Sequence, residues 1–584
     1  MKLNSFIAVG LIVAVFTTTS CCTCRQTQCV QEEAPSSIHV KDKKLIHFGW
    51  VAPSTIEHFN DSTIEQLNEG PFDGLGIIPS LKLNRDGKVI SYYLPYYLPR
   101  AVGAPEILTE EDLKDWVPAI KRLQQTRLKH NFIRSNSSLF TGNWFDDEGW
   151  ERTLNNYGML AWLAKQSDCE GLCIDIEAYE YTGRPFQFKP ELGYTYEETA
   201  AKVRQRGKEW IEELNRQFPG LTLFAFFWTS QCDSEQKIFA RDAEDFGTTG
   251  LQIPFFNGVY DGAPDNMKIV DGNEHNGYLA AGINDYNRIT ANFYRFGKGW
   301  IDPIHHEKFN RITSMGVALY LDSYVPREKP GAYNLFTRTD NPTQFLYENL
   351  SHALSFSDEY VWMWCEKGVF WPSINGTKTF KAWDDLLPNT NLVIEAAKNP
   401  SAAALKYADK TNVLRNGELN AGESGAAWGL NQEKCGITSW SSWQSRHSPT
   451  GIIKPENGMV RMIGVTDGCI AQSILDIKEG EQFVVTAKAK SESAISQPNL
   501  TYFFRDSKGT GLWALQRSHP FTEEIKDGWK RSTVIVTVPS GLDVKSLCIS
   551  VGCKGAPLPE GKEDKGVLFD DVGAYRVAYP WIKK

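Results

Sequence analysis

The octet Glu170–Glu177 holds the residues of this sequence that are best suited to acid–base chemistry. It reads Glu-Gly-Leu-Cys-Ile-Asp-Ile-Glu, an apolar strand that ends in two carboxylic acids. Alternate side chains of a strand share one face, so Asp175 and Glu177 should face the same way as Cys173, opposite to Ile174. Two neighbouring acids repel each other, which raises at least one pKa, as a general acid requires. The alternative interpretation is a structural Asp that caps a loop.

A second acidic group follows another apolar stretch. Val270–Glu274 reads Val-Asp-Gly-Asn-Glu, so Asp271 and Glu274 flank a glycine where the backbone is free to turn tightly. An acidic turn at the carboxyl end of a strand suits a nucleophile or a base. An ordinary Asp-Gly turn is the alternative.

Two further strands carry acids beside aromatic residues. Alternation over Tyr360–Glu366 places Trp364 and Glu366 on one face, as a sugar platform beneath a carboxylate would be. Large core packing is the alternative. On the preceding strand Tyr320 and Asp322 share a face, and Asp322 is a weaker candidate. Two other tryptophans end predicted strands and could line the pocket floor or belong to the core: Trp50 and Trp228.

These acids predict a glycoside hydrolase site. Such enzymes use two carboxyl groups, which lie about 5–5.5 Å apart for retention and about 6.5–9.5 Å apart for inversion. We assign Glu177 as the general acid, with Asp271 or Glu366 as its partner and Asp175 as the group that tunes Glu177. No cofactor is expected for catalysis.

The elements that must position these acids alternate between strands and helices. Capping boxes at Thr109–Asp112 and Thr195–Glu198 begin helices, and Phe218-Pro219-Gly220 ends the second one. Eight strand candidates separated by helices predict an α/β (β/α)8 TIM barrel over 43–408, longer than the typical ~250 residues because of long loops on the catalytic face. An open α/β sheet is the alternative. The strand candidates are Leu45–Trp50, Gly74–Pro79, Asn131–Ser135, Gly171–Glu177, Leu221–Trp228, Met267–Asp271, Gly316–Asp322 and Tyr360–Glu366.

The octet also resembles the strand-four motif of family 18 chitinase-like barrels. Asp175 and Glu177 match the final Asp and the proton-donating Glu of that motif, whereas Glu170 and Cys173 depart from its earlier acidic positions. The Met-Tyr-Asp expected around strand six is absent. The resemblance therefore implies the class of barrel glycosidases and not the substrate-assisted mechanism of that family.

After about Lys410 the pattern changes to short alternating runs separated by turns, which predicts an all-β jelly-roll sandwich over 410–580. The stretches Val413–Glu418, Gly528–Arg531 and Leu568–Val572 resemble carbohydrate-binding modules of the CenC type. This resemblance implies a structural Ca²⁺ with Glu418 and Asp571 as ligands, and oxygen ligands suit that ion. Exposed tryptophans could stack on sugar rings; the candidates are Trp428, Trp440, Trp443, Trp513 and Trp529.

The N-terminus predicts an export signal over 1–20 and a lipidated tether over 21–42. Phe6–Phe16 is an unbroken apolar run too short to span a bilayer comfortably. Thr18-Thr19-Ser20-Cys21 resembles the lipobox of bacterial lipoproteins, which implies lipidation of Cys21 and anchoring to the cell envelope, at the outer membrane or cell surface. A simple secreted protein is the alternative.

The composition of the chain bears on which classes of molecule the protein binds. The chain has 584 residues with 62 Lys+Arg against 71 Asp+Glu, a formal charge of −9, and this acidic balance argues against nucleic acid. Aromatic residues reach 12%, which fits stacking on a polysaccharide or glycan. A metal-dependent hydrolase is disfavoured because the ten His form no evident ligand pair; only His305 and His306 are adjacent. The main alternative is a non-catalytic polysaccharide-binding lipoprotein that keeps the barrel as a scaffold.

Overall fold

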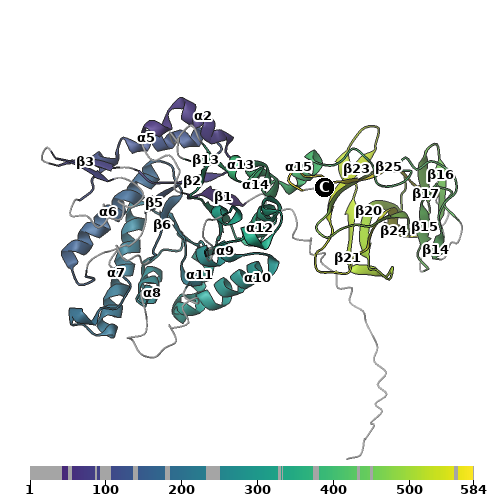
Figure 1. Cartoon of the computed structure of the whole chain (residues 1–584). Helices are drawn as coiled ribbons and strands as arrows, with labels where there is room; N and C mark the ends of the chain where they lie inside the picture. Colours follow the sequence, from purple (N-terminus) through teal and green to yellow (C-terminus); the bar gives the residue numbers. More distant parts are fainter. Residues whose placement is uncertain are drawn as a thin grey trace, which may run out of the picture.

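The computed structural model describes residues 43–49, 56–79, 81–85, 88–92, 107–135, 143–177, 184–231, 250–326, 331, 333–371, 380–429, 434–446, 451–557 and 563–582. An α/β barrel and a β-sandwich lie side by side in Figure 1, with α15 (Pro400–Lys406) at their junction. Trp50, Cys21 and the whole predicted signal and tether lie outside the described residues.

The barrel is a nearly closed parallel sheet with the strand order β10-β11-β1-β2-β5-β6-β7-β8-β9. This confirms the predicted fold class, and all eight predicted strands are present. Its strands are β1 (Lys44–His47), β2 (Gly74–Ile77), β5 (Phe132–Ser135), β6 (Gly171–Ile174), β7 (Thr222–Ala225), β8 (Lys268–Asp271), β9 (Thr313–Met315), β10 (Val317–Tyr320) and β11 (Tyr360–Trp364).

The stretch of chain at the seventh predicted strand forms two short strands with different partners. The predicted strand, Gly316–Asp322, matches only β10, which pairs with β11. The preceding strand β9, which was not predicted, pairs with β8. Gly316 separates the two strands, and its backbone N–H donates to Asp271 O at 2.8 Å. One stretch of chain therefore brings the two ends of the sheet together.

Helices surround this sheet, as Figure 1 shows. The capping boxes predicted at Thr109 and Thr195 are both present, where the side chain of the first residue and that of the residue three positions later cap each other's backbone. The barrel helices are α2 (Asp61–Glu69), α4 (Glu110–Leu113), α5 (Trp116–Lys121), α6 (Asp147–Gln166), α7 (Tyr196–Gln217), α8 (Gln252–Gly262), α9 (Glu274–Leu279), α10 (Ile283–Ala291), α11 (His306–Ile312), α12 (Pro342–Phe356), α13 (Trp383–Leu386) and α14 (Thr390–Lys398).

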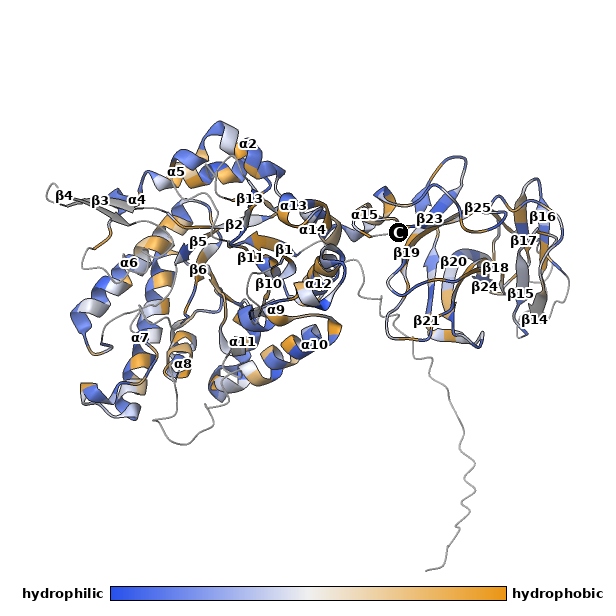
Figure 2. Cartoon of the chain, viewed as in Figure 1, coloured by the Kyte–Doolittle hydropathy of each residue, from blue (hydrophilic) through white to orange (hydrophobic). Residues whose placement is uncertain are grey.

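Aromatic rings fill the barrel interior. Phe226 stacks on Trp362 with ring centroids 4.3 Å apart, and Phe48 lies 4.9 Å from Phe224. All four side chains are almost completely buried. In Figure 2 the barrel strands are coloured mainly as hydrophobic, while α6 and α7 alternate hydrophobic and hydrophilic residues. The interior is thus a packed core, and only its carboxyl end is left for chemistry.

The second domain is a sandwich of two six-stranded sheets, with orders β14-β15-β18-β24-β20-β21 and β16-β17-β25-β19-β23-β22. This confirms the predicted all-β region. Its strands are β14 (Ala427–Gly429), β15 (Ser441–Gln444), β16 (Ile452–Glu456), β17 (Met459–Ile463), β18 (Asp467–Leu475), β19 (Gln482–Ser491), β20 (Ser496–Arg505), β21 (Gly511–Pro520), β22 (Glu523–Glu524), β23 (Lys530–Thr537), β24 (Ser546–Gly555) and β25 (Val567–Arg576).

The segment after β25 returns to the barrel. The Trp581 indole donates to the Gln344 side-chain oxygen at 2.9 Å, and the Asn341 amide donates to Trp581 O at 2.7 Å. Tyr579 stacks on Trp581 with centroids 4.6 Å apart, and Tyr347 of α12 lies 5.5 Å from Tyr579. We call residues 577–582 the clasp, because they join the sandwich to the barrel core.

Candidate functional site

The two acids of the strongest sequence motif lie just past the end of β6. The strand stops at Ile174, and the backbone N–H of Glu177 donates to Asp175 Oδ1 at 2.9 Å, which turns the chain. Asp175 is buried, with 7% of its surface exposed, whereas Glu177 is half-buried. Burial, followed by the charge of Glu177, raises the pKa of Asp175 to about 7.

A buried cation underlies these acids. Arg134, at the third position of β5, has no exposed surface and donates from Nη1 to Phe48 O at 2.7 Å. Its guanidinium carbon lies 4.4 Å from the Trp364 ring centroid and 5.1 Å from that of Phe226. The positive charge opposes the rise of the Asp175 pKa. Sequence reasoning missed Arg134, although its alternation with Phe132 along a predicted strand already pointed it into the barrel.

Glu274 is the third acid of this group. It is the first residue of α9, and its backbone N–H donates to Phe226 O at 3.0 Å, which ties the start of the helix to the end of β7. Desolvation, then the charges of Asp175 and Glu177, raise the pKa of Glu274 well above its usual range. The structure thus brings Asp175, Glu177 and Glu274 into one electrostatically coupled group, which we call the carboxyl triad.

Three tyrosines surround the Glu274 side of the triad. Tyr278 lies one helical turn after Glu274, and its ring centroid is 5.1 Å from that of Tyr320 and 5.4 Å from that of Tyr333. The Tyr278 hydroxyl is buried, and desolvation, followed by the charge of Glu274, raises its pKa. Tyr333 is positioned by His275, whose Nδ1 lies 2.9 Å from the Tyr333 hydroxyl.

Asp271 lies in a different environment from the triad. It has no exposed surface, and its carboxylate accepts the backbone N–H groups of Trp228 at 3.1 Å and Ser230 at 2.8 Å. The Ser230 hydroxyl and the Asn273 backbone N–H also donate to it. These donors occupy both oxygens, so the geometry gives Asp271 the role of fixing the loop after β7 and not that of a base.

Asp322 and Glu366 also hold backbone and side chains in place. Asp322 is fully buried and accepts the backbone N–H groups of Glu366 and Lys367 at 2.8 and 2.9 Å, while burial raises its pKa to about 6. Glu366 accepts the Trp364 indole N–H at 2.8 Å and the Tyr320 hydroxyl at 3.1 Å. Glu366 therefore borders the mouth and orients two aromatic residues there.

The predicted tryptophan platforms have different outcomes. Trp364 is at the mouth but only 9% exposed, with one ring face against Arg134. Trp228 has no exposed surface and packs on Phe256 with centroids 3.9 Å apart, so it belongs to the core and does not line a pocket. A core position was the alternative for this residue, and the apolar end of β7 continues into it.

Calcium binding in the sandwich by Glu418 and Asp571 stays a prediction. The Asp571 carboxylate lies 2.6 Å from the Lys488 ammonium, which a metal would have to displace. The described residues contain no group of three His, Cys, Asp or Glu that could hold a metal ion. Seven described cysteines are free thiols, and all but Cys469 are buried.

One face of the sandwich carries small side chains between two exposed tryptophans. Trp443 of β15 is 38% exposed and Trp513 of β21 is 61% exposed. Three strands separate them, so they lie four strand spacings, or about 19 Å, apart across the sheet, and further when their offset along the strands is included. Trp440 is buried, Trp529 is half-buried, and the side chain of Trp428 lies outside the described residues. The small residues between the tryptophans are Cys469, Ala471, Ser473, Asn499, Thr501, Cys548, Ser550 and Gly552.

Comparison with known proteins gives no family. No family model matches, and no curated protein matches. Solved structures that match include the enzymatically active domain of bacteriophage CBA120 tailspike protein 4, at 15% identity and a TM-score of 0.19 over 28% of this chain and 21% of that one. A CBM4 module matches at 18% identity and a TM-score of 0.19, over 28% of this chain and 98% of its own.

A third match is the CBM22-1 xylan-binding domain from Paenibacillus barcinonensis, at 14% identity and a TM-score of 0.17, over 26% of this chain and 90% of its own. The chain thus spans about a fifth of the phage domain but nearly all of each carbohydrate-binding module. At these values the ligands of those proteins are not transferred to this chain. No helix among the described residues is long and apolar enough to cross a membrane.

Proposed function

We propose that this protein is a glycoside hydrolase whose active site is the carboxyl triad at the mouth of the barrel. The observation that carries this proposal is the grouping of Asp175, Glu177 and Glu274, in which burial and then the neighbouring carboxylates raise the pKa of Asp175 to about 7 and that of Glu274 well above its usual range. Glycoside hydrolysis needs one carboxyl group that keeps its proton near neutral pH and one that has lost it. A barrel places such groups at the carboxyl ends of its strands.

The roles within the triad follow from these environments. Glu274 is the proposed proton donor, because desolvation and two neighbouring acids make it retain its proton. Glu177 is the proposed base or nucleophile, because it is partly exposed to solvent just past the end of β6 and its charge acts on the proposed donor Glu274. Asp175 adjusts both through its charge. This exchanges the role that the sequence motif suggested for Glu177 and replaces Asp271 and Glu366 by Glu274 as its partner.

The test is hydrolysis of a panel of natural glycans, followed by reducing-end release, with wild-type protein and the variants Glu177→Gln and Glu274→Gln. Each variant should lose about 10²–10⁴-fold in kcat/KM on unactivated glycans, the range for loss of an acid or base. The matched control is Glu191→Gln, which removes an exposed acid of the 184–195 loop. Unchanged turnover in both triad variants would exclude the triad as the catalytic group.

Aryl glycosides with good leaving groups separate the two roles. They need no proton donor, so Glu274→Gln should keep most of its activity on a dinitrophenyl glycoside while Glu177→Gln stays inactive. Azide should rescue only Glu177→Gln, because a small anion replaces a missing nucleophile or base. The opposite pattern would return the acid role to Glu177.

A second candidate function is glycan binding without turnover, with the barrel as a scaffold. The sandwich face between Trp443 and Trp513 favours it, since exposed aromatic rings around small polar side chains suit the flat faces of sugars. Binding of a glycan that the wild-type protein never hydrolyses would favour this candidate. In the proposed enzyme the same face holds the polymer that the barrel cleaves.

We also propose that Cys21 is lipidated and that the protein is anchored in the cell envelope. The support is the sequence around Cys21 alone. Cys21→Ser should move the protein from the membrane fraction to the soluble fraction, and Cys22→Ser is the matched control. Membrane retention of Cys21→Ser would contradict this proposal.

A further inference from the structure

A cavity lies on the flank of the barrel, apart from the carboxyl triad. It has a volume of about 540 Å³ and is bounded by the first halves of α7 and α8 and by residues 300–302. This volume falls within the range of about 300–1,000 Å³ that is typical of small-ligand sites. None of its lining residues belongs to the triad or to the tyrosines around it.

The helices that form the cavity walls are fixed against each other. A Cβ at Gly258 of α8 would lie 1.9 Å from Arg204 O, and one at Gly207 of α7 would lie 2.2 Å from Phe255 O. The two glycines therefore allow a backbone approach that other residues would prevent. The spacing of α7 and α8, and with it the width of the cavity, is set by the backbone.

Most of the wall is apolar and aromatic. Tyr196, Ala200, Ile253, Pro254 and Trp300 contribute to it. The Tyr196 hydroxyl donates to Gly250 O at 3.2 Å, which holds its ring at the start of α7. Rings and methyl groups of this kind suit the C–H face of a sugar ring.

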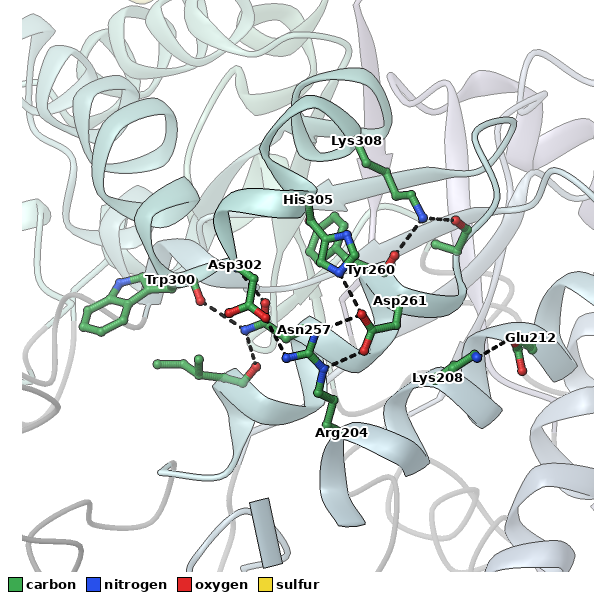
Figure 3. A network of polar contacts seen from close by, with 12 residues as sticks. Arg204, Lys208, Glu212, Asn257, Tyr260, Asp261, Trp300, Asp302, His305 and Lys308 are labelled. Atoms are coloured by element: carbon green, nitrogen blue, oxygen red, sulfur yellow. Dashed lines mark hydrogen bonds and ion pairs between the residues drawn. The ribbon is translucent and has the colours of Figure 1, made fainter. Parts of the chain in front are cut away.

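Two residues that line the cavity, Arg204 and Asp302, belong to a network of polar contacts, as Figure 3 shows. Arg204 donates from Nε and Nη2 to the two oxygens of Asp261 at 2.6 and 2.8 Å, and from Nη1 to Asp302 at 2.6 Å. Asp261 is held from behind by His305 Nε2 at 2.7 Å. Arg204 and Asp302, which line the cavity, are 37% and 43% exposed in their side chains.

Asn257 of α8 fixes the segment that carries the aromatic wall. Its amide donates to Trp300 O at 3.2 Å, and its oxygen accepts the Asp302 backbone N–H at 2.7 Å. Asn257 is itself almost fully buried. One buried side chain thus positions both Trp300 and Asp302 at the cavity.

The cavity lies at the same end of the barrel as the triad. A helix that follows a barrel strand begins at the carboxyl end of that strand, and α7, which follows β6, begins at Tyr196. The cavity is lined by the first three turns of α7, and therefore by its mouth-side half.

We propose that this cavity is a second glycan-binding site that holds one sugar ring of a neutral polymer, beside the active site. Trp300 and Tyr196 contact the ring face, while Asp302 and Arg204 bind its hydroxyl groups. An anionic sugar is disfavoured, because Arg204, the one cation among the described residues that line the cavity, is already paired with two carboxylates. The inference rests on the proposed glycan activity and extends it from the mouth to the barrel flank.

Affinity electrophoresis of the full chain tests this site with xylan, laminarin, galactomannan and, as the anionic probe, polygalacturonate. All variants carry Trp443→Ala and Trp513→Ala, so that the sandwich face does not dominate retention. Trp300→Ala removes the aromatic wall, and Ala201→Trp fills the cavity without removing any of its contacts. Phe296→Ala, at an exposed aromatic residue outside the cavity, is the matched control.

A neutral polysaccharide should retard the background protein, which carries only Trp443→Ala and Trp513→Ala. Trp300→Ala and Ala201→Trp should each raise the apparent Kd for that polysaccharide by about tenfold, as expected for loss of an aromatic contact and its hydrogen bonds. Phe296→Ala should stay within about twofold of the background. Equal retention by all variants, no retention by any neutral probe, or tighter retention by polygalacturonate would overturn the site. Hydrolysis is measured separately on wild type: retention that depends on Trp300 without any hydrolysis would refute the proposed enzyme and leave this site standing.

Discussion

The guanidinium of Arg134 lies against the face of Trp364, with its central carbon 4.4 Å from the ring centroid. The edge of the same indole is held by Glu366 through a hydrogen bond of 2.8 Å. Glu366 therefore acts on the buried cation through Trp364, and the cation in turn acts on the carboxyl triad. Positioning and protonation at the mouth are linked through these three side chains.

Removing the buried cation should move the pH dependence of activity. Arg134 lowers the pKa of Asp175 and of Glu274, so Arg134→Met should raise both and shift the profile of kcat/KM against pH upward by about one unit. Arg122→Met, which breaks a surface ion pair with Asp61, is the control. An unshifted profile in a folded Arg134→Met protein would contradict the electrostatic role of this residue.

Asp175 should make the protein less stable as the pH rises. Its folded pKa of about 7 exceeds its usual value, so the native state keeps a proton that the unfolded state has lost between about pH 4 and 7. The free energy of unfolding should therefore fall across that window by at most about 4 kcal/mol from this group, and Asp175→Asn should remove the fall. Urea unfolding at pH 5 and pH 8 measures this, and an equal pH dependence in wild type and variant would refute it.

Asp271→Asn should lower the free energy of unfolding, in addition to any effect that it has on activity. The amide places N–H groups where Asp271 now accepts the backbone of Trp228 and Ser230, so about 2–4 kcal/mol of unfolding free energy should be lost. Glu177→Gln should unfold like wild type, since no described hydrogen bond from its side chain supports the fold. Equal urea midpoints for the two variants would show that Asp271 does not anchor this loop.

The sandwich tryptophans should affect binding of polymers and leave cleavage of small substrates unchanged. Trp443→Ala with Trp513→Ala should weaken polysaccharide affinity by about tenfold, because two exposed rings are lost. Turnover of a soluble aryl glycoside should stay the same. Trp529→Ala, on the turn before β23, serves as the matched control, and equal affinity in both proteins would contradict this use of the face.

The clasp should couple the unfolding of the two domains. Trp581 is 4% exposed, so Trp581→Ala should lose about 3–5 kcal/mol of contact between sandwich and barrel. Calorimetry should then show two transitions where wild type shows one. Leu475→Ala, at an exposed position of β18, is the control, and a single unshifted transition in Trp581→Ala would contradict the coupling.

The positions of the helices and strands were predicted from the sequence more accurately than the residues at which the strands end. Alternation and helix caps located every strand of the nine-stranded sheet except β9, but β6 and β7 end at Ile174 and Ala225, earlier than expected. Past the end of β6 the backbone N–H of Glu177 donates to Asp175, and past the end of β7 that of Trp228 donates to Asp271 of β8. These hydrogen bonds bend the chain away from the strand. Apolar residues continue beyond both strands, so hydrophobicity alone overestimates their length.

Two acids of the candidate site were predictable from the sequence. Alternation along the predicted strand placed Glu177 on its inward face, and Glu274 was found because it closely follows the end of an apolar strand. What alternation does not reveal is which donors reach each acid. Asp271 and Asp322 are occupied by N–H groups of loops distant in sequence from them, up to 45 positions away. Tyr333 joins the mouth from a separate loop, through His275. Such pairings arise only when the strands assemble.

The clasp has a consequence for the order in which this chain matures. Gln344 of α12 accepts a hydrogen bond from Trp581, which lies 237 positions downstream. Until Trp581 has been synthesised, the side of α12 that carries Gln344 and Tyr347 is uncovered. During synthesis the barrel strands are complete long before this cover exists. A ribosome-bound barrel therefore exposes this aromatic side of α12 to solvent. It is covered only when the finished sandwich has left the ribosome and Trp581 packs against it.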